Sequence, residues 1–301
     1  MYYSGRMRNL CRLFTKTGPF LLFLFLFSCF PPPKNNVNQN AAGMAAGKTA
    51  GMAAGRDSLE AAESGGEFAA QLSVVMRNAQ LPSALSQKIQ AASALNSAFI
   101  TDLSACLAQD RHLWELVDKQ HPLPADYVPS PLVTLTEGAY QVSRAGLTLR
   151  RDAAESLAEM ATAARGGGVT LIASSAYRSY RYQEEVYNRN VREMGREAAD
   201  RESARPGLSQ HQTGLALDFG SIDDSFAQTA AGRWLSANAA RFGWSLSFPN
   251  GYEAVTGYRW ESWHYRYVGK EIAAFIDNYF DGIQQYALRF MYEWEQVKAP
   301  R

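Results

Sequence analysis

The sequence has little cysteine, little histidine and no long apolar run. Its 301 residues include 3 cysteines and 4 histidines. Beyond residue 28 only Cys29 and Cys106 remain, so one disulfide at most could form between them. The apolar run 20–27 is too short for a transmembrane helix, which takes ~20 residues. A membrane-spanning segment is therefore not predicted.

The sequence also lacks an excess of positive charge. Its formal net charge is +1, and residues 1–28 hold Arg6, Arg8, Arg12 and Lys16 with no acidic side chain. The rest of the chain carries 26 basic and 29 acidic side chains, a net charge of −3. Because no basic surplus remains, we expect no nucleic-acid partner.

Residues 1–29 are typical of an export signal, with a basic segment ending at Lys16 and an apolar core before Ser28 and Cys29. The run Leu26-Phe27-Ser28-Cys29 resembles a loose bacterial lipobox, which implies that Cys29 is acylated and becomes the mature N-terminus. We therefore expect an exported lipoprotein, anchored in the membrane and facing the periplasm or cell wall. The alternatives are an ordinary signal peptide cleaved nearby and a disulfide between Cys29 and Cys106.

Two further segments precede the part of the chain that carries chemistry. Residues 30–56 contain three prolines, a polar Asn-rich run and a short Gly-Met-Ala-Ala-Gly repeat, and this composition predicts a flexible linker. Residues 57–110 are predicted to be a helical extension, because apolar residues recur every three or four positions. We favour packing of this extension on the rest of the chain over a docking or dimerising role. The periodic residues are Leu85, Ile89, Ala92, Leu95, Phe99, Leu103 and Leu107.

The stretch 209–218 holds two good zinc ligands, His211 and Asp218, seven positions apart. On one helix this spacing separates them by ~10 Å. On one straight strand an odd spacing puts them on opposite faces. The chain must therefore bend between them, and Gly214 permits the bend. After it, the alternation of Leu215, Leu217 and Phe219 with Ala216 and Asp218 predicts a short strand with the carboxylate on its polar face.

A second stretch, 260–269, supplies the remaining candidates. His264 can complete a His, Asp, His ligand set with His211 and Asp218, and Glu261 lies three residues before it as a candidate base. A catalytic zinc takes three protein ligands and keeps one position for water. We therefore predict one Zn²⁺ per chain.

The two stretches together resemble a known family. S-x-H-x-x-G-x-A-x-D followed by E-x-W-H is similar to the signature of the LAS metallopeptidases, and most similar to the VanY-type D-alanyl-D-alanine carboxypeptidases. The similarity runs from about residue 113 to 270. It implies a catalytic domain at 111–270 with an α+β fold, in which a small, mostly antiparallel sheet carries the zinc site and helices flank it. Residues 271–301 are predicted to form C-terminal helices, for which core packing is favoured over membrane contact.

The resemblance also implies roles for residues outside the ligand set. In Ser-Ala-Tyr-Arg-Ser, Ala176 replaces the usual Gly, and Arg178 is expected to stabilise the oxyanion or bind a substrate carboxylate. Ser209, as the first letter of the family motif, is expected to line the substrate pocket. Gln183 and Tyr177 are weaker pocket candidates. His112 and His121 have no spaced partner, so we expect structural roles for both.

The function implied by the resemblance is hydrolysis of the terminal D-alanine from peptidoglycan stem peptides, with Glu261 as general base and acid. An L,D-carboxypeptidase or a peptidoglycan endopeptidase on the same scaffold is an alternative. A tethered module that binds cell-wall peptides without turnover is another. Such a module would be expected to have lost Glu261 or a ligand, and this sequence retains them.

Periodicity and turn residues predict the remaining elements of the catalytic region. They are a helix at 151–165, a strand at 169–174, a helix at 182–194, a helix at 234–242, a strand at 244–248, a loop from there to 258, and a last strand at 264–268.

Overall fold

The computed structural model describes residues 65–94 and 97–298. The predicted signal segment, the linker and Cys29 lie outside the described residues. Cys106 is described: it is buried, and its thiol lies 3.6 Å from the carbonyl oxygen of Glu271.

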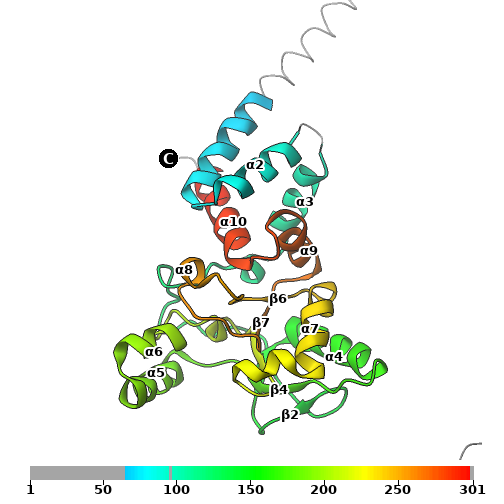
Figure 1. The fold of residues 1–301 in the computed structure, drawn as a ribbon, viewed down its shortest axis with the longest axis vertical. Coiled ribbons are helices and arrows are strands. Elements are labelled where there is room, and N and C mark those ends of the chain that lie inside the picture. The colour runs from blue at the N-terminus through cyan, green and yellow to red at the C-terminus, as the bar shows by residue number, and fades with distance from the viewer. Residues whose placement is uncertain (1–64, 95–96, 299–301) are drawn as a thin grey trace, which may run out of the picture. The chain divides into compact units, whose positions relative to one another are not determined.

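A five-stranded sheet forms the centre of the catalytic region (Figure 1). Its strand order is β2-β4-β5-β7-β6, and three of the four pairings in this described sheet are antiparallel, the exception being β2 with β4. The expected small, mostly antiparallel sheet is thus confirmed. Its strands are β2 (Gln141–Val142), β4 (Ile172–Ser175), β5 (Ala216–Phe219), β6 (Trp244–Leu246) and β7 (His264–Tyr267). A separate two-stranded ribbon pairs β1 (Leu132–Thr134) with β3 (Thr148–Arg150).

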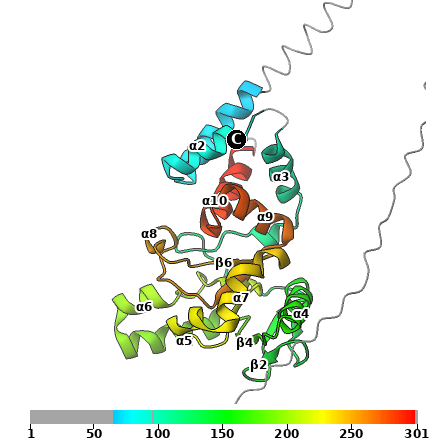
Figure 2. The same cartoon turned by 45° about the vertical axis from the view of Figure 1, so that its right-hand side comes forward.

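Helices flank this sheet, with α5 and α6 at its left end and α4 at its right end in Figures 1 and 2, and with α7 next to α4 in Figure 1. None of the described helices is long and apolar enough to cross a membrane. Residues 65–78 are helical. The other α-helices are α2 (Ser83–Ala92), α3 (Ala98–Leu107), α4 (Arg151–Gly166), α5 (Tyr180–Met194), α6 (Arg196–Glu202), α7 (Ala230–Asn238), α8 (Glu253–Thr256), α9 (Lys270–Tyr279) and α10 (Gln284–Lys298). The 3₁₀ segments are η1 (Arg111–Trp114), η2 (Gln210–Thr213), η3 (Asp224–Gln228) and η4 (Ala239–Phe242).

Most predicted elements of the catalytic region are confirmed within a few residues. The strand predicted at 169–174 begins later, at Ile172, because residues 166–168 are a run of glycines that ends α4 and a turn and coil follow it. The loop predicted from 249 to 258 is wrong in part, since it contains the one-turn helix α8. A helix of four residues is too short to show a 3.6-residue period, so the sequence pattern could not reveal it.

The helical extension packs on the C-terminal helices. The ring of Phe99 in α3 lies 5.0 Å from that of Tyr279 and 5.6 Å from that of Phe275, both in α9, and 6.2 Å from that of Phe290 in α10. Aromatic pairs at such separations stabilise a core beyond the area they bury. These contacts bear out the expectation that the extension packs on the rest of the chain and that the C-terminal helices join the core.

Gly214 ends η2 in the left-handed conformation, with φ of +73°, and the chain then enters β5. A Cβ at this position would lie 3.0 Å from a side-chain carbon of Pro129 and 3.2 Å from one of Arg150. The predicted bend between His211 and Asp218 is therefore present, and both conformation and space favour glycine there.

We expect Gly214→Ala to lower the free energy of unfolding by about 1–2 kcal/mol, the usual cost of a side chain in left-handed backbone. Denaturant unfolding followed by circular dichroism measures this. Gly138→Ala is the matched control, because a Cβ there meets nothing within 4 Å. Equal stability of the two variants would show that the turn tolerates a side chain.

Candidate active site

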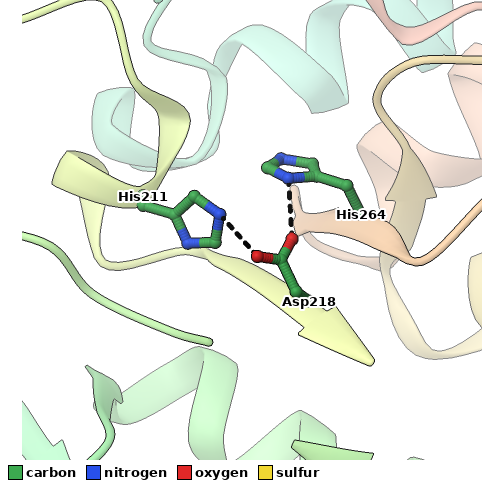
Figure 3. Close-up of side chains that lie close together, drawn as sticks. All are labelled: His211, Asp218 and His264. Carbon is green, nitrogen blue, oxygen red and sulfur yellow. Dashed lines mark ion pairs between the residues drawn. The ribbon is translucent and has the colours of Figure 1, made fainter. Parts of the chain in front are cut away.

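Three elements bring His211, Asp218 and His264 together (Figure 3). His211 lies in η2, Asp218 in β5 and His264 in β7. Each offers one ligand atom, and the three atoms lie within 4.8 Å of one another. All three side chains are buried. A cluster of this size and composition can hold one metal ion.

The sheet register and the Gly214 turn explain the convergence. Asp218 in β5 is directly opposite His264 in β7, so both side chains lie on one face of the sheet. The turn at Gly214 returns the chain so that His211 reaches the same face from η2. Ser175 in β4 is opposite Asp218 on its other side, which brings the start of the Tyr177–Arg178 loop to the cluster.

Hydrogen bonding leaves one nitrogen of His211 free to bind a metal. Its Nδ1 donates to the carbonyl oxygen of Ala176 at 2.8 Å, and a carbonyl can only accept. Nε2 is therefore the unprotonated nitrogen, and it lies 3.2 Å from Asp218 Oδ2. Burial and the nearby Arg178 guanidinium lower the pKa of His211 to about 4. The imidazole is thus neutral near pH 7, the form that ligates metals.

Asp218 is a buried carboxylate with an unsatisfied oxygen. Its Oδ1 lies 3.0 Å from His264 Nδ1 but makes no hydrogen bond, whereas Oδ2 accepts one from Arg178 Nη2 at 2.9 Å. The charged Arg178 guanidinium on Oδ2 favours the ionised form of this buried carboxylate. A metal ion would neutralise this ionised, buried oxygen, which has no hydrogen-bond donor. The residues present are therefore suited to bind a cation.

Glu261 lies beside the cluster rather than in it. Its Oε2 is 3.6 Å from His264 Nδ1, and its backbone N–H donates to the carbonyl oxygen of Phe248 at 3.0 Å. Burial, followed by the charge of Asp218, raises the pKa of Glu261 well above its usual range. A carboxylate with a raised pKa is a better proton acceptor, which suits a general base.

Arg178 is held by three neighbours. Its Nε and Nη2 donate to Ser175 Oγ, its Nη2 also donates to Asp218, and its Nη1 donates to Gln183 Oε1. A guanidinium has five N–H groups, and these four bonds leave one for a ligand. Gln183 is itself fixed, since its Nε2 donates to the carbonyl oxygen of Ala204 at 2.7 Å. Gln183 therefore orients Arg178.

A cavity of about 270 Å³ opens over the cluster. Of the residues predicted from the sequence, six line it and two do not. Tyr177 and Gln183 do not line it. The side chain of Gln183 accepts a hydrogen bond from Arg178, and the backbone N–H of Tyr177 donates to the carbonyl oxygen of Thr148. The six that line it are Arg178, Ser209, His211, Asp218, Glu261 and His264.

Sequence reasoning did not single out three residues that contact the cluster. Gln210 Oε1 lies 3.2 Å from His264 Nε2, Ser175 Oγ accepts from Arg178, and the ring of Phe248 lies 4.7 Å from that of His264. Gln210 was detectable, since it stands next to His211 inside the motif. Ser175 and Phe248 reach the site only through strand pairing and a turn, which spacing does not reveal.

The other two histidines have structural partners. His112 lies 2.8 Å from Asp152 Oδ2 and 2.8 Å from Asp110 Oδ1, and His121 Nδ1 lies 2.7 Å from Asp118 Oδ1. Neither belongs to the His211 cluster, which is the one metal-competent group found among the described residues. Each thus has carboxylate partners of the kind that the predicted structural role requires.

An α+β fold that gathers two histidines, an aspartate and a nearby glutamate in one cavity defines a candidate metal-dependent hydrolase. Residues 146–270 match the VanY family model, described as D-alanyl-D-alanine carboxypeptidase, and the chain belongs to this family. The resemblance seen in the motifs is therefore confirmed.

Individual relatives cover part of the chain. The putative carboxypeptidase YodJ of Bacillus subtilis (strain 168) is 38% identical over 54% of this chain and 62% of that protein. The solved LdcB LD-carboxypeptidase is 37% identical, with a TM-score of 0.50 over 56% of this chain and 85% of that one. The vancomycin resistance D,D-pentapeptidase VanY, solved as a mutant in complex with Zn(II), is 34% identical, with a TM-score of 0.48 over 56% of this chain and 96% of that one. The chain spans 58% to 63% of the length of the first three curated relatives.

We expect His211→Ala to lose most of its bound metal, because two protein ligands hold zinc far less tightly than three. Metal analysis of the purified protein by mass spectrometry measures this. His112→Ala is the control and should keep its metal, since its partners lie outside the cluster. Full metal content in His211→Ala would contradict the ligand set.

Proposed function

We propose that this chain is a zinc-dependent D,D-carboxypeptidase that removes the terminal D-alanine from peptidoglycan stem peptides. The observation that carries the proposal is a single cavity lined by His211, Asp218 and His264 together with Glu261. Membership of the VanY family supports the reaction class. We propose both the identity of the metal, zinc, and the identity of the substrate, a peptidoglycan stem peptide.

His211, Asp218 and His264 would hold the metal, one ion per chain. Two imidazole nitrogens and one carboxylate oxygen are a donor set that suits zinc, and three protein ligands leave a position open. When bound, zinc supplies a Lewis acid that polarises the scissile carbonyl and lowers the pKa of a coordinated water to about 7.

Glu261 is the proposed general base and acid. It would accept the proton of the attacking water as the new C–O bond forms at the carbonyl carbon. It would then deliver that proton to the nitrogen of the leaving D-alanine as the peptide C–N bond breaks. Its burial supports this role, because a carboxylate with a raised pKa is a stronger proton acceptor than an exposed one. Phe248 fixes the backbone of Glu261 and so limits its motion.

Arg178 is proposed to bind the substrate's terminal carboxylate or the oxyanion that forms at the attacked carbon. Its guanidinium is partly buried, with 17% of the side chain exposed, and one N–H remains after its bonds to Ser175, Gln183 and Asp218. A charged hydrogen bond in such a sheltered position is stronger than one at the surface. Ser209 is proposed to line the substrate pocket beside it.

A second candidate is L,D-carboxypeptidase activity on the same scaffold. The LdcB LD-carboxypeptidase is similar to this chain over 85% of its own length, at 37% identity. The metal cluster, Glu261 and Arg178 would serve either reaction, because the bond broken in each case precedes a C-terminal D-amino acid. The two differ in the length and stereochemistry of the peptide, so only a substrate comparison separates them.

We expect Glu261→Gln to keep its zinc but lower kcat by roughly 100- to 10,000-fold, since an amide cannot accept the proton. Steady-state kinetics with a purified stem peptide measures the loss, and metal analysis of the same sample is the control. Near-normal kcat with full metal content would place the base elsewhere.

The terminal carboxylate is tested with a pentapeptide ending in D-Ala-D-Ala, its C-terminal amide and a tetrapeptide. We expect the amide to react on the order of 100-fold more slowly or worse, because a sheltered cation is left unpaired. Product analysis by mass spectrometry measures the rates. Equal rates for acid and amide would contradict carboxylate recognition, whereas preference for the tetrapeptide would move the assignment to L,D-carboxypeptidase.

Arg178→Lys should lose this preference for the free acid, because an ammonium cannot reproduce the guanidinium geometry. Arg189→Lys is the matched control. Arg189 lines the same cavity, is exposed and makes no ion pair among the described residues. A lost preference in the Arg189 variant alone would transfer carboxylate recognition to that residue.

We further propose that Cys29 is acylated and anchors the enzyme at the outer face of the membrane. The lipobox-like run before Cys29 and the polar linker after it support this. We expect Cys29→Ser to move the mature protein from the membrane fraction to the soluble fraction, because the acyl chains that hold it would be absent. Immunoblots of the two fractions measure the change. Unchanged membrane association would contradict the lipid anchor.

A further inference from the structure

A buried chain of hydrogen bonds connects His264 to the first residue of α10. His264 Nε2 lies 3.2 Å from Gln210 Oε1, Gln210 Nε2 donates to Gln284 Oε1 at 3.3 Å, and Gln284 Nε2 donates to the carbonyl oxygen of Ser245 at 3.1 Å. Ser247 Oγ also donates to Gln210 Oε1, at 2.7 Å. All five residues are less than 9% exposed. Gln284 lies outside residues 146–270, the segment that matches the family.

The carbonyl group of Ser245 determines which way each amide in this hydrogen-bonded series is oriented. The carbonyl oxygen of Ser245 in β6 can only accept, so the group of Gln284 that faces it must be the NH₂. The oxygen of Gln284 therefore faces Gln210 and the Ser247 hydroxyl, each 3.3 Å away. Ser247 has one hydroxyl proton and lies closer to Gln210 Oε1, at 2.7 Å, so it donates there and the NH₂ of Gln210 donates to Gln284. The oxygen of Gln210 is then turned toward His264 and accepts from its Nε2–H.

We propose that Gln210 and Gln284 are positioning residues that keep the proton of neutral His264 on Nε2, so that Nδ1 presents its lone pair to the metal. The inference rests on the proposed metal site. Through Gln284, helix α10 helps to organise that site, although α10 lies outside the segment that matches the family. Ser247 supports the same orientation of Gln210.

The opposite tautomer is the natural competitor. His264 Nδ1 lies 3.0 Å from Asp218 Oδ1 and 3.6 Å from Glu261 Oε2, and both oxygens would accept a proton held there. Without Gln210, the proton of the metal-free imidazole should move to Nδ1, and metal binding must then displace it. Outer hydrogen-bond partners of this kind typically change metal affinity about 10- to 100-fold.

His211 provides an internal comparison. Its Nδ1 donates directly to the carbonyl oxygen of Ala176, so a main-chain group fixes its tautomer without any relay. Substitutions in the Gln210–Gln284 pair should leave His211 unchanged. The two imidazoles of one cluster therefore respond differently to the same variant.

The experiment compares wild type with Gln210→Met, Gln284→Met and Gln210→Glu. Methionine keeps the length of the side chain and removes its polar groups, whereas glutamate keeps the acceptor that faces His264. The 4 histidines of the chain make ¹⁵N-histidine NMR tractable, and it reports directly which ring nitrogen carries the proton. Spectra are taken on metal-free protein at alkaline pH, and His264→Asn assigns the resonance. Zinc affinity is measured separately by chelator competition.

We expect wild type and Gln210→Glu to show His264 as the Nε2–H tautomer, and Gln210→Met to show Nδ1–H with zinc binding weakened 10-fold or more. Gln284→Met should show a mixture of tautomers and an intermediate affinity. An unchanged His264 tautomer in Gln210→Met would overturn the proposal, and unchanged spectra and affinity in Gln284→Met would overturn the part assigned to α10. The spectra need no turnover, so a wild type that shows Nε2–H but fails to hydrolyse stem peptides would contradict the proposed function alone.

Discussion

The structure depends on one buried carboxylate. Asp218 is ionised in a place where burial disfavours charge, and its Oδ1 has no hydrogen-bond donor. Such a group is costly unless an opposite charge neutralises it. Arg178 contacts Oδ2, and the two imidazoles hold their unprotonated nitrogens toward the carboxylate by bonds on their far sides. The surrounding residues thus prepare a site for a cation, and a metal ion would complete the neutralisation.

Several distant parts of the chain maintain this arrangement. The left-handed turn at Gly214 returns the chain so that His211 reaches the sheet, and the register between β5 and β7 places Asp218 opposite His264. Gln183 holds Arg178, and Gln284 reaches the cluster through Gln210. The C-terminal helices are in turn packed against α3. Side chains that never meet a substrate therefore determine how well the site is organised.

For His211 and Asp218 the prediction rested on local spacing, whereas His264 was joined to them with the support of the resemblance to the family motif. Spacing required a bend at Gly214, and the residue types on either side left little choice of ligand. Contacts between segments distant in the chain were not predictable in the same way. Gln284 stands 74 positions after Gln210, so no period connects them. Gln183 was expected in the pocket but orients Arg178 instead, since the length of a side chain does not say which neighbour it meets. The helix α8 was not predicted, because a single turn is too short to show a helical period.

Beyond the candidate metal ligands, the cavity is lined in part by α5 and by the loop that carries Ile222. D,D- and L,D-carboxypeptidases are both named among the similar proteins. Met194 and Ile222 line the cavity while 43% and 53% exposed, and Arg189 lies on the same helix as Met194. Met194 and Ile222 thus give this part of the cavity exposed apolar surface. For the proposed carboxypeptidase, α5 and the Ile222 loop are therefore candidates to contact the peptide outside the reaction centre.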